Sequence, residues 1–169
     1  TLEIAARLKQ EYMLEPLLHL TCVGAHRTGL SSFLEDVADS GCENILALRG
    51  DPPRGETTFI PDSEDFRHGC DLVHFIRDGF PRFCVGVAGY PEKHPEAPSM
   101  ERDIAWLRHK VQCGADFVIT QLFFDNNAYF RFVDQARSAG VTVPIIPGVL
   151  PVRNLAALKR MLGFCGASV

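Results

Sequence analysis

Two kinds of apolar pattern alternate along the chain. Short apolar runs rich in β-prone residues predict buried strands, and longer segments whose apolar positions recur at helical spacing predict helices. The expected strands are 17–23, 44–48, 83–88, 117–120 and 143–146, and the expected helices are 1–13, 30–40, 65–78, 99–113, 126–139 and 154–162. This alternation is typical of an α/β protein whose parallel strands are joined by right-handed crossovers.

The residues between these segments support the same pattern. Gly41, Gly114 and Gly140 stand where helices should end, and each is followed within a few residues by the next expected strand. Candidate residues for capping the helix N-termini are Ser31 or Ser32, Ser99 and Asn154. The local signals therefore agree with the periodicity.

Length leaves two architectures to consider. The 169 residues fit one domain, and five strands in a chain of this size match a flavodoxin-like doubly wound sheet. A (β/α)8 barrel needs eight strands and about 250 residues. Length and periodicity alone thus favour the doubly wound sheet. In both architectures the active site lies at the carboxyl ends of the strands.

Composition excludes several classes of protein. Apolar residues make up 46% of the chain and charged residues 22%, as in a soluble globular protein. The net charge of −4 and a pI near 5.8 argue against a nucleic-acid binder, which gains affinity by neutralising phosphates. The longest nearly apolar stretch, 141–152, contains three prolines and is too short to span a bilayer. We therefore expect neither a nucleic-acid nor a membrane partner.

The cysteines and the absence of several known motifs further restrict the possible compartment and the possible functions. The six cysteines form no CxxC motif and lie mostly in apolar segments, so we expect free thiols in a reducing, cytoplasmic compartment. No spacing of His, Cys and carboxylates predicts a metal site, and no dinucleotide, P-loop or nucleophile-elbow fingerprint is present. No signal peptide is visible, and the chain starts without Met inside an expected helix, so we expect part of a longer protein.

The first two strand ends carry polar side chains. His19 shares a face with Thr21 on the first strand, where a lone histidine is most often a hydrogen-bonded core residue. The second strand runs directly into Arg49-Gly50-Asp51, two opposite charges around a glycine that allows close approach of a ligand. A polar turn is the simpler interpretation. The irregular stretch 51–63 that follows is long enough to favour a functional loop over a tolerated insertion.

The later strand ends add flat and charged groups. Tyr90 and His94 follow the third strand in a proline-rich turn, where a stiff connection is the alternative. Asp103 and Lys110 share a face of the next helix, which is otherwise explained as a solvated charged face. Gln121 ends the fourth strand and suits the edge of a heterocycle. Together these groups predict a site for a large, flat heteroaromatic ligand.

Five segments carry a resemblance to a known family. In order and spacing, 19–22, 47–52, 89–97, 119–125 and 145–151 resemble methylenetetrahydrofolate reductases. The resemblance implies a (β/α)8 barrel with FAD that reduces 5,10-methylenetetrahydrofolate to 5-methyltetrahydrofolate, using NADH or NADPH in a ping-pong reaction. It displaces the doubly wound alternative. It also implies that residues 1–169 are one incomplete catalytic barrel without its first two strands and its last, from a protein that is a homo-oligomer when full length.

The same resemblance implies roles for individual residues. Asp51 and Gln121 would be the catalytic and folate-binding residues. Asp51 would stabilise the cationic iminium form of the methylene group, and Gln121 would bind folate and orient the nicotinamide. The expected FAD contacts are His19, Arg49, Gly50, Asp51, Tyr90, His94, Ala97, Asp103 and Lys110.

Some positions depart from the family pattern. The family's general acid is a glutamate on the first barrel strand, which this sequence lacks, so protonation of the folate nitrogen has no donor here. A non-catalytic flavin- or folate-binding fragment is therefore the second hypothesis, and an unrelated βα domain with a polar cleft is the third. A glutamate on an upstream strand would decide for the enzyme. The positions to which no role is carried over are Trp106, His109, Ala157 and Met161.

Overall fold

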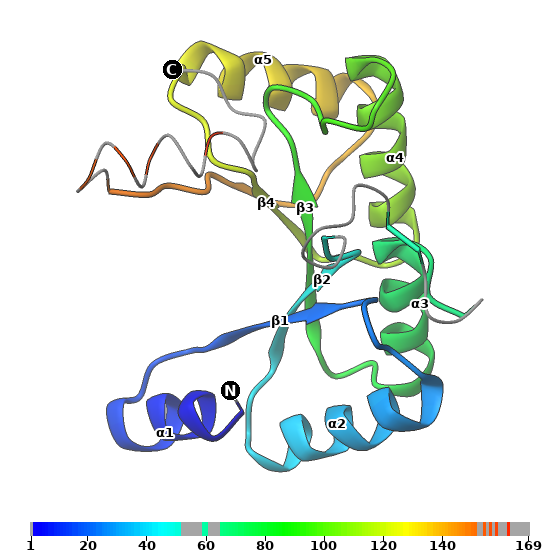
Figure 1. Cartoon of the computed structure of the whole chain (residues 1–169), viewed down its shortest axis with the longest axis vertical. Coiled ribbons are helices and arrows are strands. Elements are labelled where there is room, and N and C mark those ends of the chain that lie inside the picture. Colours follow the sequence, from blue (N-terminus) through cyan, green and yellow to red (C-terminus); the bar gives the residue numbers. More distant parts are fainter. Residues whose placement is uncertain are drawn as a thin grey trace. The chain divides into compact units, whose positions relative to one another are not determined.

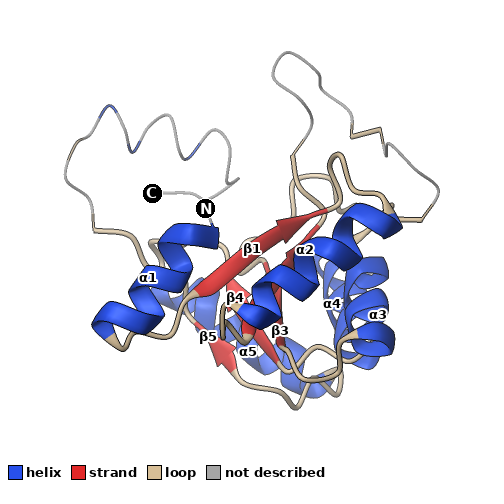
Figure 2. Ribbon diagram, turned by 90° about the horizontal axis from the view of Figure 1, so that it is seen from below, coloured by secondary structure: helices blue, strands red, loops and turns tan. Residues whose placement is uncertain are grey.

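The structure is a computed structural model that describes residues 2–51, 59–60, 65–151, 154, 156, 158 and 162. Helices and strands alternate along the chain (Figures 1 and 2). The elements are α1 (Leu2–Tyr12), β1 (Leu17–Thr21), α2 (Arg27–Asp39), β2 (Asn44–Leu48), α3 (Gly69–Gly79), β3 (Cys84–Gly89), α4 (Met100–Gln112), β4 (Phe117–Thr120), α5 (Asn126–Ser138) and β5 (Ile145–Ile146). All five expected strands and the first five expected helices are confirmed, and the helix expected over 154–162 falls largely outside the described residues.

The strands form a five-stranded sheet in the order β1-β2-β3-β4-β5. Three pairs of strands run parallel: Leu17 lies opposite Asn44 in β1 and β2, Asn44 opposite Cys84 in β2 and β3, and Val118 opposite Ile145 in β4 and β5. Each strand thus follows its predecessor in space as well as in sequence. A flavodoxin-like sheet would have the order 2-1-3-4-5. The sequential order is that of a (β/α)8 barrel, so the architecture favoured by length alone is wrong.

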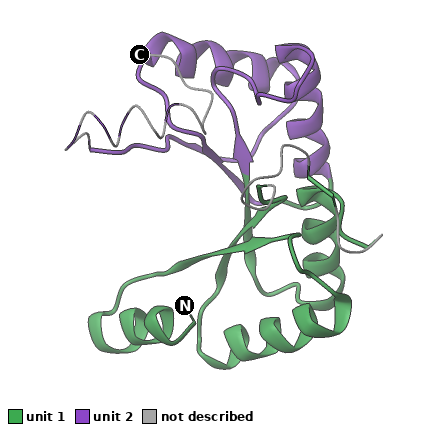
Figure 3. Cartoon of the chain, viewed as in Figure 1, with its two compact units in different colours: residues 1–87, 113–115 green, residues 88–112, 116–169 purple. Residues whose placement is uncertain are grey.

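The chain divides into two compact units, shown in different colours in Figure 3. Unit 1 contains residues 1–87 and 113–115. Its core comes from the apolar stripes of α2 and α3 and from the buried residues of β2 and β3, and α3 packs against β2. The fully buried large side chains of this core include Leu34, Val37, Ile45, Leu72, Val73, Ile76 and Val85.

Unit 2 contains residues 88–112 and 116–169. Here α4 packs against α5, and Val118 of β4 and Phe132 of α5 are fully buried. A Cβ on Gly89 would lie only 2.7 Å from the Phe132 ring and 2.8 Å from Val118. The last residue of β3 is therefore a glycine because no side chain fits at this position.

Helix ends follow the expected chemistry with one exception. Gly41, Gly114 and Gly140 all have positive φ, and the Ser99 hydroxyl accepts a hydrogen bond from the backbone N of Arg102 at 3.3 Å. A serine cap of the second helix is wrong, because α2 begins a turn earlier, after His26. The buried stripe of this helix already starts at Leu30, so the two serines lie inside the helix.

Two further sequence expectations concern cysteines and membranes. The five described cysteines form no disulfide, and Cys22 and Cys42 are buried, whereas Cys165 lies outside the described residues. Among the described residues, no helix has the length and apolar character needed to cross a bilayer.

Candidate functional site

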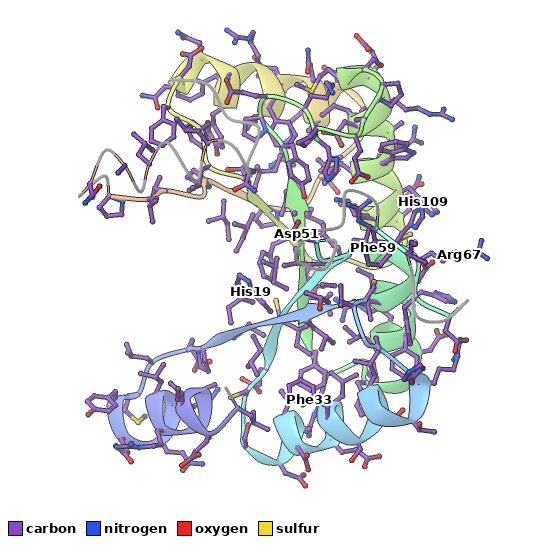
Figure 4. All side chains as sticks on the ribbon, viewed as in Figure 1. His19, Phe33, Asp51, Phe59, Arg67 and His109 are labelled. Carbon is purple, nitrogen blue, oxygen red and sulfur yellow. The ribbon has the colours of Figure 1, made fainter. Side chains whose placement is uncertain are left out.

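Unit 1 contributes two expected site residues at neighbouring strands, His19 in β1 and Asp51 after β2 (Figure 4). His19 lies in β1 opposite Leu46 of β2, and its side chain is exposed. The interpretation of His19 as a buried core histidine is therefore wrong. Asp51 follows β2 and is also exposed. Both side chains are thus accessible to a ligand.

Gly50 produces a tight turn between Arg49 and Asp51. Its φ is +90°, and a Cβ at this position would lie 2.8 Å from Cγ2 of Val23 and 3.1 Å from Cβ of Thr21. Only glycine combines this conformation with such close approach to the end of β1. The turn therefore places two opposite charges beside the carboxyl ends of two adjacent strands.

The side chain of Arg49 lies back on its own loop. Its Nε donates to the carbonyl of Gly50 at 3.4 Å, and its guanidinium lies over the ring of Phe59, 5.1 Å from the ring centroid. This cation–π contact joins Phe59 to the residue that directly follows β2. A partly buried guanidinium held in this way is a suitable partner for an anionic group.

Asp71 organises the start of α3, and sequence reasoning missed it. One carboxylate oxygen accepts from the backbone N of Arg67 at 2.9 Å and of His68 at 2.8 Å. This capping box holds the chain where Gly69 packs 3.3 Å, measured from an ideal Cβ, from the carbonyl of Ala47. The available signal was an acidic residue three positions after a polar one. The residue thereby fixes the backbone that leads into α3.

Burial sets the thiol chemistry of unit 1. Burial raises the pKa of Cys22 to about 12, and the nearby Asp71 carboxylate acts in the same direction. Burial raises the pKa of Cys70 to about 11, again with help from Asp71. These thiols remain protonated near neutral pH and are poor nucleophiles.

In unit 2 the loop after β3 brings Tyr90 and His94 together. Their rings meet edge to face with centroids 4.6 Å apart. Asp103 of α4 is only 8% exposed, and its carboxylate accepts from the backbone N of His94 at 2.9 Å. The interpretation of Asp103 as part of a solvated face is therefore wrong. Lys110 reaches back from the same helix, and its Nζ donates to the carbonyl of Ala88 at 2.5 Å.

The remainder of this loop is tightly bonded. Ala97 is buried, and its backbone N donates to the carbonyl of His94 at 2.9 Å. Lys93, which sequence reasoning did not single out, has a φ of +79° and donates from Nζ to the carbonyls of both His94 and Ala97. A lysine in a proline-rich turn gives no sequence signal for such a role.

Gln121 stands at the end of β4, half-buried. Its backbone N donates to the carbonyl of Gly89 at 2.7 Å, and its Oε1 accepts from the backbone N of Leu122 at 2.8 Å. The expected hydrogen-bond partner is thus the adjacent backbone. Phe123 stacks on Tyr129 with centroids 5.1 Å apart, so it contributes to packing within unit 2.

The expected site residues form two groups, one in each unit. His19, Arg49, Gly50 and Asp51 lie in unit 1, and Tyr90, His94, Ala97, Asp103, Lys110 and Gln121 lie in unit 2. Trp106 and His109 are exposed on α4, and Ala157 and Met161 fall outside the described residues. No group of three or more His, Cys, Asp or Glu side chains in the described part of the chain could hold a metal ion.

Comparison with known proteins identifies the family to which the chain belongs. A family model for methylenetetrahydrofolate reductase matches residues 1–169. The chain belongs to the methylenetetrahydrofolate reductase family. Enzymes of this family use a flavin cofactor.

Named relatives agree with this assignment. The chain is 40% identical to "Methylenetetrahydrofolate reductase (NADH) 1" of Zea mays over 179 aligned residues, which cover all of this chain and 30% of the maize protein. It is 40% identical to "Probable methylenetetrahydrofolate reductase (NADPH)" of Caenorhabditis elegans, covering 94% of this chain and 24% of that protein. The chain thus spans less than a third of these relatives.

A solved structure shares the fold. An uncharacterized protein from Clostridium thermocellum, described as binding two copies of 5-methyl-5,6,7,8-tetrahydrofolic acid, superposes with a TM-score of 0.60 at 15% identity. The match covers 96% of this chain and 54% of the other. At this identity the likeness supports the fold alone.

Proposed function

We propose that the chain is part of the catalytic barrel of an enzyme that reduces 5,10-methylenetetrahydrofolate to 5-methyltetrahydrofolate with NAD(P)H and FAD. The observation that carries the proposal is the family match over all 169 residues. Because the chain spans only part of its relatives, the activity is proposed for the whole protein. The two relatives described above are named for NADH and for NADPH, so both nicotinamides remain candidates.

The residues present fit FAD. Lys110 places a cation beside the end of β3, and Arg49 places another beside the end of β2, as binding of phosphates requires. At Gly50 a Cβ would collide with Val23 and Thr21, so this glycine keeps the turn between Arg49 and Asp51 tight against the end of β1. Tyr90 and His94 supply a rigid aromatic pair for ring packing.

Two residues are the proposed contacts to the folate substrate. The exposed carboxylate of Asp51 can hold the pterin edge and oppose the positive charge of the iminium form that must exist before reduction. The amide oxygen of Gln121 is engaged by Leu122, so its NH2 group is the end that donates to folate. Bound FAD supplies hydride transfer between the nicotinamide and folate substrates.

The proton needed to open the folate ring must come from elsewhere in the whole protein. None of the described residues assigned to the site is a glutamate. We propose that residues 1–169 are one incomplete barrel domain of a cytoplasmic homo-oligomer, and that the missing acid lies on a strand outside this chain. The second candidate, a piece that binds flavin and folate without catalysis, follows if the whole protein has no such acid.

Purification of the full-length protein tests this function. We expect it to copurify with a yellow cofactor that chromatographic analysis after extraction identifies as FAD. We also expect NAD(P)H-dependent formation of 5-methyltetrahydrofolate. FMN or no flavin would contradict the cofactor assignment, and bound FAD without folate reduction would favour the non-catalytic alternative.

A further inference from the structure

Lys93 lies in the loop between β3 and α4, next to the proposed flavin-binding residues of unit 2. Its φ of +79° is one of two positive values among the described non-glycine residues. Its backbone N donates to the carbonyl of Tyr90 at 3.1 Å, which closes a tight turn directly after β3. A left-handed conformation is unfavourable for a residue with a Cβ, and it persists only where surrounding contacts hold it.

The ammonium group of Lys93 supplies such contacts. Its Nζ donates to the carbonyl of His94 at 3.0 Å and to that of Ala97 at 2.6 Å. Hydrogen bonds from a charged donor are shorter and stronger than those between neutral groups. The lysine therefore closes the turn from His94 to Ala97 around its own ammonium group.

Oppositely charged side chains hold the two backbone polar groups of His94. Its N–H donates to the carboxylate of Asp103 at 2.9 Å, and its carbonyl accepts from Lys93. The ring is constrained as well, because Nδ1 accepts from the backbone N of Glu96 at 3.1 Å and the ring meets Tyr90 edge to face. When the ring is neutral, this bond places its proton on Nε2. The position, direction and tautomer of His94 thus depend on one set of loop contacts.

We propose that Lys93 is a positioning residue for flavin binding, which holds Tyr90, His94 and Ala97 in the shape that receives the cofactor. This inference rests on the proposed function, because it takes the loop to be part of the FAD site. It concerns a side chain that acts through the loop backbone, so its loss should weaken cofactor binding more than it weakens the fold.

Titration of the full-length apoprotein with FAD tests the proposal, with quenching of flavin fluorescence as the readout. Lys93→Met keeps the aliphatic stem and removes both carbonyl contacts. Lys93→Gly removes the same contacts and also relieves the positive φ. Lys9→Met is the matched control, because Lys9 bonds to Glu15 and Glu43 in unit 1. Thermal unfolding of each apoprotein gives its stability separately.

We expect both Lys93 variants to raise the Kd for FAD about tenfold, as loss of a charge-assisted hydrogen bond implies, and Lys9→Met to leave it unchanged. The decisive result is Lys93→Gly, which should lose affinity although its apoprotein, relieved of the positive φ, unfolds at a higher temperature than that of Lys93→Met. If Lys93→Gly binds FAD as tightly as the wild type, Lys93 serves only the local fold and the inference is wrong. If the wild-type protein binds no FAD, the proposed function itself fails and this inference with it.

Discussion

Replacing Gly50 with alanine separates two demands that the turn after β2 makes on its backbone. Alanine at a φ of +90° carries a conformational penalty of about 1–2 kcal/mol. Its Cβ would also lie 2.8 Å from Val23 and 3.1 Å from Thr21, and overpacking of this kind typically costs 1–3 kcal/mol. Val23 is 39% exposed and can move aside in part, so about 1–2 kcal/mol is the expected steric share.

Gly41→Ala provides the matched control for this measurement. Gly41 has a φ of +79°, but an added Cβ there meets nothing within 4 Å, so only the conformational penalty applies. We expect the free energy of unfolding, measured by urea denaturation of the full-length apoprotein, to fall about 1–2 kcal/mol further for Gly50→Ala than for Gly41→Ala. Gly50→Ala should also weaken FAD binding, because the flanking Arg49 and Asp51 shift with it. Equal losses of stability in the two variants would refute the claim of close approach at Gly50.

Three further outcomes follow from the structure. In stopped-flow experiments, Asp51→Asn should slow flavin reoxidation by methylenetetrahydrofolate roughly 10²- to 10³-fold, because this step contains a developing cation. The same variant should slow flavin reduction by NAD(P)H little, because that step contains no such cation. Equal slowing of both steps would mean that Asp51 only positions FAD. Gly89→Ala should lower the free energy of unfolding by about 1–3 kcal/mol, because the added Cβ collides with Phe132. Gly79→Ala should not lower it, because an added Cβ there has open space around it. Equal stabilities of the two variants would show that the side chains around Gly89 rearrange without cost. The pKa of Cys22 is raised to about 12 in the folded state from an ordinary 9.0, so its contribution to stability is complete below about pH 9 and is lost as pH rises toward 12. In urea denaturation, the free energy of unfolding of Cys22→Ala should therefore fall less steeply with rising alkaline pH than that of the wild type. Identical pH profiles would contradict this.

The secondary structure followed from the sequence because its signals are local. The strand period, the helix period and the glycines at helix ends each involve residues a few positions apart, and the strands 44–48 and 117–120 were predicted to the residue. The serine cap of α2 was misplaced by one turn, because serine is tolerated inside a helix whose apolar stripe is long enough. The family motifs could also be recognised from the sequence, because they depend on order and spacing alone. The roles of the individual site residues remain predictions.

The properties that depend on residues distant in the sequence became visible only in the tertiary structure. The order of the strands separates a barrel from a doubly wound sheet, and periodicity cannot reveal it because both have the same alternation of elements. The local pattern alone predicts His19 in the core and Asp103 in solvent, but His19 is exposed and Asp103 is buried against the backbone of His94. Lys93 gave no signal at all, because its role arises from a left-handed turn that directs its ammonium group onto two carbonyls. Burial and hydrogen bonding of a side chain are set by the segments packed around it, and sequence periodicity contains no information on which segments those are.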